Sequence, residues 1–387
     1  SMIRGNPEFT LIDEQKLVYE TALFLAQTAK NSPKKQVMIV EGGPGTGKSV
    51  VAINLLVEIT NRKLLTQYIT KNAAPRAVYQ SKLTGTLNAH RFNSMFQSSG
   101  SYVDTPYNTF DCLIVDESHR LNDKSGLYRN KGENQIKEII NAAACSIFFI
   151  DEDQRIHMQD IGTKDEIAKW AKRVGADIHE YELPSQFRCN GSDGYLAFID
   201  NILQIRDTAN INLDDVNYDF RVCDDPNELF DLIKEKNKVD NKARVVAGYC
   251  WDWVSKRHPG EMDIVFPEFN FAKQWNLSVD GSLWIMQPNS IEQIGCIHTC
   301  QGLELSHVGV IIGNDLIVRN GKVLVDPAKR SSGDRSMHGY RAINDTEEGK
   351  IKIRALIKNT YKTLMTRGMK GCYVYCTDKE TAEYFKS

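Results

Sequence analysis

The stretch from Gly42 to Ser49 reads GGPGTGKS and holds residue types that together can bind a triphosphate. It fits the spacing G-x-x-x-x-G-K-[ST] and follows the apolar run QVMIV directly. Glycines let backbone N–H groups turn toward phosphate oxygens, and the positive end of a following helix favours the same anions. We expect Lys48 to reach the β- and γ-phosphates and the Ser49 hydroxyl to ligate Mg²⁺. The predicted nucleotide contacts are Gly42, Gly43, Pro44, Gly45, Thr46, Gly47, Lys48 and Ser49.

Two acidic residues follow a second apolar run in a way that suits metal-assisted hydrolysis. The stretch DCLIVDESH places Asp116 at the end of a predicted strand and Glu117 directly after it. An acid at such a strand end can hold Mg²⁺, and an adjacent carboxylate can orient and deprotonate the attacking water. We therefore assign Asp116, with Ser49, to the metal and Glu117 to catalysis. The alternative is a strand end that carries two solvated acids.

Two glutamines are candidates for contacts with the nucleotide. Gln154 lies in FFIDEDQR, after a third apolar run, where its amide can hydrogen-bond both water and the γ-phosphate and so take part in catalysis. Asp151 or Asp153 in this stretch could instead cap the following turn. Gln15 precedes the first predicted strand, and its amide has the donor and the acceptor that an adenine edge requires. Glutamine is also common on amphipathic helices, so Gln15 alone is not a specific signal.

The segments that must position these residues alternate between β-rich apolar runs and helical patterns. Such alternation is typical of parallel sheets with crossover helices and predicts an α/β fold. A helix is predicted from Lys48 to about Ile59, because Val51, Leu55 and Ile59 recur at helical spacing. The predicted strands of this first series lie at 36–40, 66–70, 111–115, 146–150 and 177–183.

A second series of similar size begins after Pro184, so we expect two domains, at residues 1–184 and 185–387. A helix is predicted over 226–236, with Asp225 as its N-cap and Pro226 at its first position, and another over 346–364. Asn320-Gly321 lies between β-rich runs and predicts an inserted hairpin. The predicted strands of this series lie at 243–249, 294–299, 308–313 and 371–376.

Charge is nearly balanced overall but unevenly distributed along the chain. The formal net charge is −2, so any contact with nucleic acid must rest on local basic segments. No acidic residue lies between Glu58 and Asp104 or from Gly349 to Thr377, and both intervals are rich in lysine and arginine. Both could face polyanions, either nucleotide phosphates or a nucleic-acid backbone, or they could be ordinary solvated faces.

The cysteines favour a reducing compartment. There are nine of them without a framework pattern, which is more typical of free thiols in the cytoplasm than of disulfides. No apolar run approaches the ~18 residues of a membrane span, and the start shows no secretory signal, so we expect a cytoplasmic protein without a membrane partner. A zinc site remains an alternative, since Cys296, His298 and Cys300 would share one face of a strand, as would Cys372 and Cys376.

The order of short motifs resembles that of superfamily 1 helicases and translocases. More narrowly, it is similar to the helicase-like module of Schlafen-type proteins and its prokaryotic relatives of unknown function. Several motifs are weak alone, but together they span nearly the whole chain in the family's order. The resemblance implies two RecA-like P-loop domains that use ATP and Mg²⁺. The matching stretches are LIDEQ, GGPGTGKS, TKNAAPR, DESHR, DEDQR, SQFRCNGSDGY, IHTCQGLE and YKTLMTRG.

The resemblance also implies roles for residues far from the phosphate loop. Arg188 and Arg367 would be arginine fingers that reach the phosphates when the two domains close, and such residues are worth about 10³–10⁵ in rate in other enzymes. Gly302 and Glu304 would lie near the nucleotide, with Glu304 on the ribose hydroxyls. Phe92 equally suits a hydrophobic core. The implied nucleic-acid contacts are Asn72, Arg76, His90, Phe92, His298 and Thr299.

These features predict an ATP-driven nucleic-acid motor stimulated by single-stranded nucleic acid, with DNA favoured over RNA and a protein partner allowed. Only the intervals 116–154 and 248–294 could hold small inserted subdomains, so ATP hydrolysis and translocation are better supported than strand separation. Two other classes stay open: a nucleotide-gated interaction module and a P-loop phosphotransferase. Stimulation of ATP hydrolysis by nucleic acid would separate the motor from both.

Overall fold

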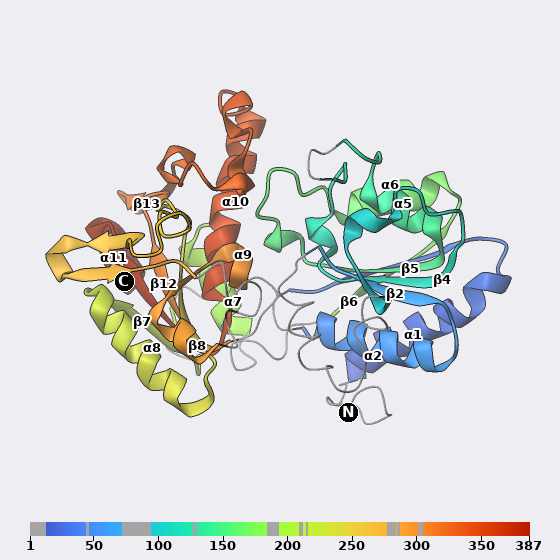
Figure 1. The fold of residues 1–387 in the computed structure, drawn as a ribbon, viewed down its shortest axis with the longest axis horizontal. Coiled ribbons are helices and arrows are strands. Elements are labelled where there is room, and N and C mark those ends of the chain that lie inside the picture. The colour runs from blue at the N-terminus through green and yellow to red at the C-terminus, as the bar shows by residue number, and fades with distance from the viewer. Residues whose placement is uncertain are drawn as a thin grey trace. The chain divides into compact units, whose positions relative to one another are not determined.

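The chain forms two compact units, each with its own sheet and core (Figure 1). The first comprises residues 1–155 and 159–185, and the second comprises residues 156–158 and 186–387. The computed structural model describes residues 13–43, 46–71, 94–126, 130–183, 193–208, 212–213, 216–276, 284, 287–300 and 305–387.

The first unit is built on a six-stranded parallel sheet with the strand order β3-β2-β4-β5-β1-β6. β1 and β5 are interior strands of this sheet and are buried along almost their whole length, which explains their continuous apolar runs. Because the strands are parallel, the carboxyl ends of β1, β4 and β5 share one edge. The strands are β1 (Gln36–Glu41), β2 (Thr66–Ile69), β3 (Phe96–Gln97), β4 (Phe110–Val115), β5 (Ala143–Ile150) and β6 (Asp177–Glu182).

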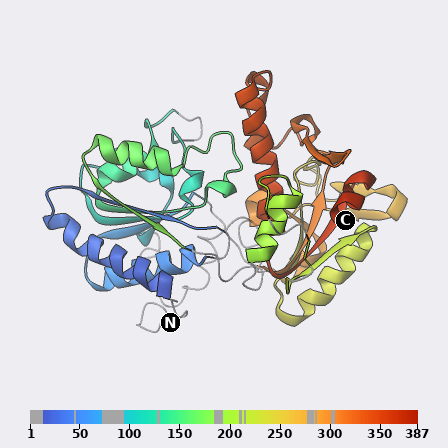
Figure 2. The same cartoon turned by 180° about the vertical axis from the view of Figure 1, so that it is seen from behind.

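Helices cover both faces of this sheet, as the view from behind shows (Figure 2). α1 (Asp13–Thr28) and α2 (Lys48–Asn61) pack their apolar residues against one face. α5 (Gln135–Ala142) and α6 (Lys164–Arg173) pack against the other. Side-chain caps fix the starts of the second pair, since Asn134 accepts a hydrogen bond from Ile136 N and Thr163 from Glu166 N.

The second unit carries a five-stranded parallel sheet with the order β11-β8-β12-β15-β7. Its strands are β7 (Asp219–Cys223), β8 (Ala243–Ala247), β11 (Ile294–Cys296), β12 (Leu305–Ile312) and β15 (Gly368–Cys376). Two antiparallel hairpins are added to it: β9 (Ile264–Phe266) with β10 (Phe271–Lys273), and β13 (Leu316–Arg319) with β14 (Lys322–Val325). The second of these is the Asn-Gly hairpin predicted above, with Asn320 at φ 51° and Gly321 at φ 70°.

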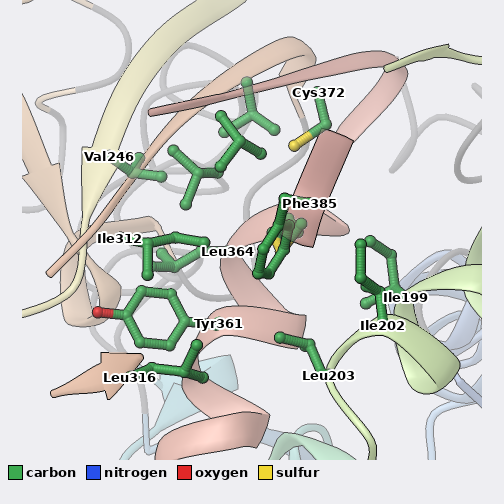
Figure 3. Packing of buried hydrophobic residues seen from close by; sticks show 14 of the residues in the cluster. Ile199, Ile202, Leu203, Val246, Ile312, Leu316, Tyr361, Leu364, Cys372 and Phe385 are labelled. Carbon is green, nitrogen blue, oxygen red and sulfur yellow. The ribbon is translucent and has the colours of Figure 1, made fainter. Parts of the chain in front are cut away.

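Helices of the second unit pack against two separate buried clusters. The described helices are α7 (Asp193–Ile202), α8 (Pro226–Asp240), α9 (Ile297–Cys300), α10 (Glu347–Met365) and α11 (Lys379–Lys386). Asp225 caps α8 through Asn227 N at 2.7 Å, as predicted. Figure 3 shows Ile199 and Ile202 of α7 in one cluster with Tyr361 and Leu364 of α10 and with the sheet residue Cys372. The two parallel sheets flanked by helices confirm the α/β fold class.

One predicted strand ends earlier than expected. Residues 294–299 were expected to be extended, but β11 stops at Cys296 and α9 begins at Ile297. The physical reason is that β8, the strand with which β11 pairs among the described residues, ends at Ala247 opposite Cys296, and the one further bridge of β11, from Ile294 to Trp275, lies at its other end. The argument that Cys296, His298 and Cys300 share a strand face is therefore wrong.

The second acid-free interval does not form a single basic surface. Lys350, Lys352 and Arg354 on α10 are exposed, but Lys358 and Lys362 further along the helix are buried. Lys358 Nζ donates to the Gln204 carbonyl at 2.6 Å, and burial, with the nearby Arg354 charge, lowers the pKa of Lys358 to about 8. Lys362 Nζ forms an ion pair with Asp200 at 2.6 Å. Two of the five basic residues in this helix therefore support the fold rather than a surface.

No helix among the described residues is both long and apolar enough to cross a lipid bilayer.

Candidate functional site

The phosphate loop lies between the carboxyl end of β1 and the start of α2. Gly47 adopts φ 79° and ψ 17° directly before the helix, a left-handed conformation that suits glycine. A Cβ on Gly42 would lie 2.5 Å from Thr46 Oγ1, so the close turn also needs a glycine there. The first turn of α2 contains no acidic residue, which leaves its positive end free to favour an anion. The described part of the loop therefore has the features predicted for a phosphate cradle.

The Lys48 ammonium is directed back onto this loop. Its Nζ donates to the carbonyl oxygens of Gly42 and Gly43, the latter at 2.8 Å, and lies 3.9 Å from Asp151 Oδ2. A triphosphate would have to replace some of these contacts, because an ammonium has only three hydrogens to donate. The lysine is thus already held at the loop that it is predicted to serve.

Gln15 supports the phosphate loop from α1. Its Nε2 donates to the Thr46 carbonyl at 3.0 Å, and the residue is buried. A Cβ on Gly47 would meet that same Nε2 at 2.2 Å, so the amide packs directly under the loop. The structure therefore brings Gln15 to the nucleotide site through a contact with the loop backbone. A contact of this side chain with adenine stays a prediction.

Three oxygens meet where magnesium was predicted. Ser49 Oγ donates to Asp116 Oδ2 at 2.7 Å, and Tyr68 Oη on β2 donates to the same oxygen at 2.5 Å. The other carboxylate oxygen, Oδ1, accepts the Glu117 N–H at 2.9 Å. Mg²⁺ prefers oxygen ligands and often takes only one or two from the protein beside nucleotide phosphates. The hydroxyl of Ser49 and the carboxylate of Asp116 therefore fit this ion.

Glu117 has an unusual backbone conformation for its residue type. Its φ of 52° and ψ of 46° lie in the left-handed region, which costs a residue other than glycine roughly 1–2 kcal/mol. The side chain is buried beside Asp116, at the start of the 3-10 helix Ser118–Arg120. Strain of this kind persists where the surrounding structure enforces it and is frequent at active sites. The conformation supports a functional role for Glu117.

The loop that carries Glu117 is held closely by a glycine from a later segment. A Cβ on Gly162 would lie 1.9 Å from the Ser118 carbonyl oxygen and 2.7 Å from His119 Cα. These are backbone atoms, so the contact cannot be relieved by a side-chain rotation.

We expect Gly162→Ala to lower the free energy of unfolding by about 1–3 kcal/mol, the usual range for overpacking. The displaced loop would also lower any activity that depends on Glu117. Gly260→Ala is the matched control, because a Cβ there meets nothing within 4 Å. Chemical denaturation of the two variants tests this, and equal stability of both would contradict the contact.

The third strand end contributes two further polar residues. Gln154 Nε2 donates to Asp151 Oδ2 at 2.5 Å, and the Asp151 N–H donates to His119 Nδ1 at 3.4 Å. Asp151 makes no side-chain capping bond to the following turn, so this alternative is wrong for Asp151. Through Asp151 the structure instead brings Gln154 near Lys48. The arrangement fits the predicted position of Gln154 at the γ-phosphate side of the site.

A buried carboxylate joins the end of β2 to the loop after Glu117. The Asp160 side chain is fully buried, with Arg120 Nε at 3.5 Å and Lys71 Nζ at 4.0 Å. Lys71 Nζ also donates to Asn122 Oδ1 at 2.6 Å. Lys71 directly precedes the segment predicted to contact nucleic acid, and this network joins Lys71 to the loop after Glu117.

In the second unit, Arg367 is buried between α10 and β15, with 1% of its surface exposed. Its Nε donates to the Thr363 carbonyl at 3.1 Å. Service as an arginine finger would require a rearrangement of this side chain.

His298 and Thr299 lie on α9 and are partly exposed. Thr299 Oγ1 donates to Asn276 Oδ1 at 3.0 Å, and His298 Nε2 lies 3.7 Å from Asp334 Oδ1. Burial acts to raise the pKa of Asp334, but Arg330 and hydrogen bonds from His298 and Ser336 lower it to about 2. His298 therefore faces a carboxylate that is ionised at neutral pH. The contact of His298 and Thr299 with nucleic acid stays a prediction.

The zinc alternative finds no support among the described residues. No three histidine, cysteine or acidic side chains come together there in a way that could hold a metal ion. Cys296 Sγ instead contacts Thr299 Oγ1 at 3.3 Å. The side chain of Cys300 is outside the described part of the chain.

Several predicted site residues lie outside the described residues, and the structure places none of them. They include one proposed arginine finger, two residues of the phosphate loop, two residues assigned to the nucleotide and four assigned to nucleic acid. These residues are Arg188, Pro44, Gly45, Gly302, Glu304, Asn72, Arg76, His90 and Phe92.

Sequence reasoning missed Tyr68 and Asp160, and it left Asp151 as a possible cap. Of these residues, Tyr68 could have been noticed in the sequence. A tyrosine hydroxyl at the otherwise apolar end of a strand requires a hydrogen-bond partner when it is buried. Asp160 lies in a loop without a motif, so only the folded chain reveals its contacts with Lys71 and Arg120.

Comparisons with known proteins found a curated relative and solved structures that each match most of this chain. The uncharacterized protein YPL245W of Saccharomyces cerevisiae is 25% identical over 426 residues, which cover 97% of this chain and 90% of that protein. The S. cerevisiae Dbp5 structure with RNA and ADP BeF3 matches 95% of this chain and 87% of its own, at 13% identity and a TM-score of 0.41. A structure of Pif1 helicases at forked double-stranded DNA matches 79% of this chain and 86% of its own, at 12% identity and a TM-score of 0.37.

A model of the Schlafen group 3 DNA/RNA helicase domain matches residues 35–378, which is most of the chain. The match begins just before β1 and ends just after β15, so it includes both parallel sheets. This chain therefore belongs to the Schlafen group 3 family and consists largely of its DNA/RNA helicase domain.

Proposed function

We propose that this protein is an ATP-driven nucleic-acid motor of superfamily 1 that hydrolyses ATP with Mg²⁺ and is stimulated by single-stranded nucleic acid. The observation that supports this most is the arrangement at the sheet edge of the first unit. There Ser49 Oγ bonds to Asp116, the strained Glu117 follows, and Lys48 Nζ lies 3.9 Å from Asp151. Hydrolysis needs an anion site, a metal ligand and a base close together, and these residues offer all three.

The proposed division of work follows from the chemistry of each side chain. The loop backbone and Lys48 hold the phosphates, while Ser49 and Asp116 hold Mg²⁺. When bound, this ion would neutralise charge that develops on the phosphate oxygens. Glu117 orients the attacking water and takes its proton. Gln154, which donates to Asp151 Oδ2, would exchange this partner for the water or the γ-phosphate.

The second unit would supply the remaining parts. We propose Arg188 and Arg367 as arginine fingers and Gly302 and Glu304 as further nucleotide contacts, on the family's motif order. The buried position of Arg367 implies that its release from the Thr363 carbonyl is part of this step.

We propose single-stranded nucleic acid as the partner, with DNA favoured over RNA. The proposed contacts on the first unit follow Lys71, which the network of Asp160 and Arg120 joins to the loop of Glu117. This network supports coupling between nucleic-acid binding and hydrolysis. The proposed contacts are Asn72, Arg76, His90, Phe92, His298 and Thr299.

We expect single-stranded oligonucleotides to raise the steady-state ATPase rate by about tenfold or more, which corresponds to roughly 1.4 kcal/mol of barrier. The measurement is kcat against the concentration of single- and double-stranded DNA and RNA at fixed low salt, because phosphate contacts weaken as salt rises. A rate that is flat across all four polymers, with nucleotide binding intact, would instead favour a nucleotide-gated interaction module. Transfer of phosphate to a small acceptor would favour a phosphotransferase.

A further inference from the structure

We propose that Tyr68 is a positioning residue for the magnesium-binding carboxylate of Asp116. This inference rests on the proposed function, since it assigns a role at the same site. The residue belongs to β2, not to the phosphate loop or to the acidic motif, and none of the motif assignments above includes it.

The Tyr68 hydroxyl is aimed at one atom of the site. Oη donates to Asp116 Oδ2 at 2.5 Å, the oxygen that also accepts the Ser49 hydroxyl at 2.7 Å. Oδ1 is held by the Glu117 N–H at 2.9 Å. Both oxygens of the carboxylate are therefore fixed, from β2, from the start of α2 and from the backbone after β4. The plane of the carboxylate is set by these three donors.

The ring of Tyr68 is rigidly placed, so its hydroxyl has little freedom. The residue has no exposed surface and belongs to the core between the sheet and helices α1 and α2. Its ring lies 5.3 Å from that of Phe96 on β3, and its backbone pairs with Ile114 on β4. The ring of Tyr68 is held in the core while its hydroxyl lies at the site. The hydroxyl can therefore orient the Asp116 carboxylate, whose lone pairs must point in a defined direction to bind a metal ion.

The Tyr68 hydroxyl matters because a group that hydrogen-bonds to a metal ligand affects how strongly that ligand binds the metal. A hydrogen bond to the ionised form of a carboxylate stabilises that form and restricts its rotation. Without the Tyr68 hydroxyl, Ser49 would be the one donor to Oδ2 among the described residues, and Ser49 must also present its oxygen to Mg²⁺. Loss of such a partner commonly costs about 10–100-fold in metal affinity or activity. Loss of the hydroxyl should therefore raise the Mg²⁺ concentration needed for nucleotide binding. The affinity for the nucleotide without Mg²⁺ should not change.

The chain supplies a matched control on the opposite face of the same sheet. Tyr102 is also buried, and its Oη donates to Gln67 Oε1 at 2.8 Å. Gln67 is the neighbour of Tyr68 on β2, and alternation along a strand sends the two side chains to opposite faces. Tyr102→Phe therefore removes one buried hydroxyl from the same strand region without touching Asp116.

The test compares Tyr68→Phe, Tyr102→Phe and the unmodified protein. A fluorescent ATP analogue is titrated at a series of free Mg²⁺ concentrations and also in EDTA, and thermal unfolding is recorded for each protein. We expect Tyr68→Phe to shift the magnesium midpoint upward by about 10–100-fold, with affinity in EDTA unchanged. Tyr102→Phe should leave both quantities unchanged. Mn²⁺ binding measured by electron paramagnetic resonance should show the same pattern without any turnover.

Failure of this inference can be separated from failure of the proposed function. If the unmodified protein binds the analogue with Mg²⁺ but Tyr68→Phe behaves like Tyr102→Phe, Tyr68 has no positioning role and the nucleotide site stands. Equal losses with Mg²⁺ and with EDTA would indicate general distortion and overturn the inference too. If the unmodified protein binds no nucleotide under either condition, the proposed function itself is wrong.

Discussion

Replacing Glu117 with glutamine should leave ATP binding nearly intact and lower kcat by about 10²–10⁴-fold, the usual contribution of a positioned general base. The amide keeps the length and shape of the side chain but cannot take a proton from water. The backbone should tolerate the change, because Gln204 in this same chain adopts φ 51°. Asp116 would still accept the N–H of residue 117, since that bond comes from the main chain. The variant should therefore accumulate bound ATP.

The measurement combines nucleotide affinity with single-turnover hydrolysis. Glu138→Gln is the matched control, because Glu138 is another buried carboxylate of the first unit whose Oε1 accepts the Glu133 N–H at 2.8 Å. A glutamine oxygen can accept that bond as well, so this control should hydrolyse ATP at the original rate. Equal rates for Glu117→Gln and the unmodified protein would remove Glu117 from the mechanism.

Lys48→Ala should abolish detectable binding of ATP. The substitution removes the ammonium that is held 2.8 Å from the Gly43 carbonyl and replaces it with a methyl group. The loop backbone would remain, but the β- and γ-phosphate charge would lose its main counter-charge from the protein. The loss should be far larger for ATP than for adenosine, which carries no phosphate. Calorimetric titration with both ligands measures this difference.

Lys164→Ala provides the control at the border of the same site. Its Nζ pairs with Glu41, the residue before Gly42, at 2.5 Å, and both side chains are about one-third exposed. Exposed pairs of this kind contribute little, so the variant should bind ATP normally. Normal ATP binding by Lys48→Ala would show that the loop does not serve as a phosphate site in this chain.

Much of the candidate nucleotide site could be predicted from the sequence, because its signals are local. Lys48 and Ser49 lie in one short loop, and Asp116 and Glu117 lie at the end of one apolar strand. Periodicity also located most strands and the start of α2, since burial on both faces of a central strand leaves a continuous apolar run. The left-handed conformation of Glu117, in contrast, has no signature in the sequence.

The residues that the sequence did not reveal are those whose partners lie far along the chain. Tyr68 reaches Asp116 because β2 and β4 are neighbours in the sheet, and Gly162 contacts Ser118 although 44 residues separate them (162 minus 118). Likewise, the acid-free stretch of α10 suggested one basic surface, but packing against Asp200 and the Gln204 carbonyl buries two of its five basic residues.

The sequence by itself therefore determined the α/β class and the order of the motifs, and it supplied the candidates for the phosphate, metal and base residues. Those properties depend on neighbours in the chain and on the repeat of apolar positions. Only the tertiary structure decided which hydroxyls and glycines fix Asp116 and Glu117, and where β11 ends. Those outcomes depend on the order of the strands in the sheet and on which side chains pack against one another. Such contacts form between segments that are far apart in the sequence, so they have no local signal.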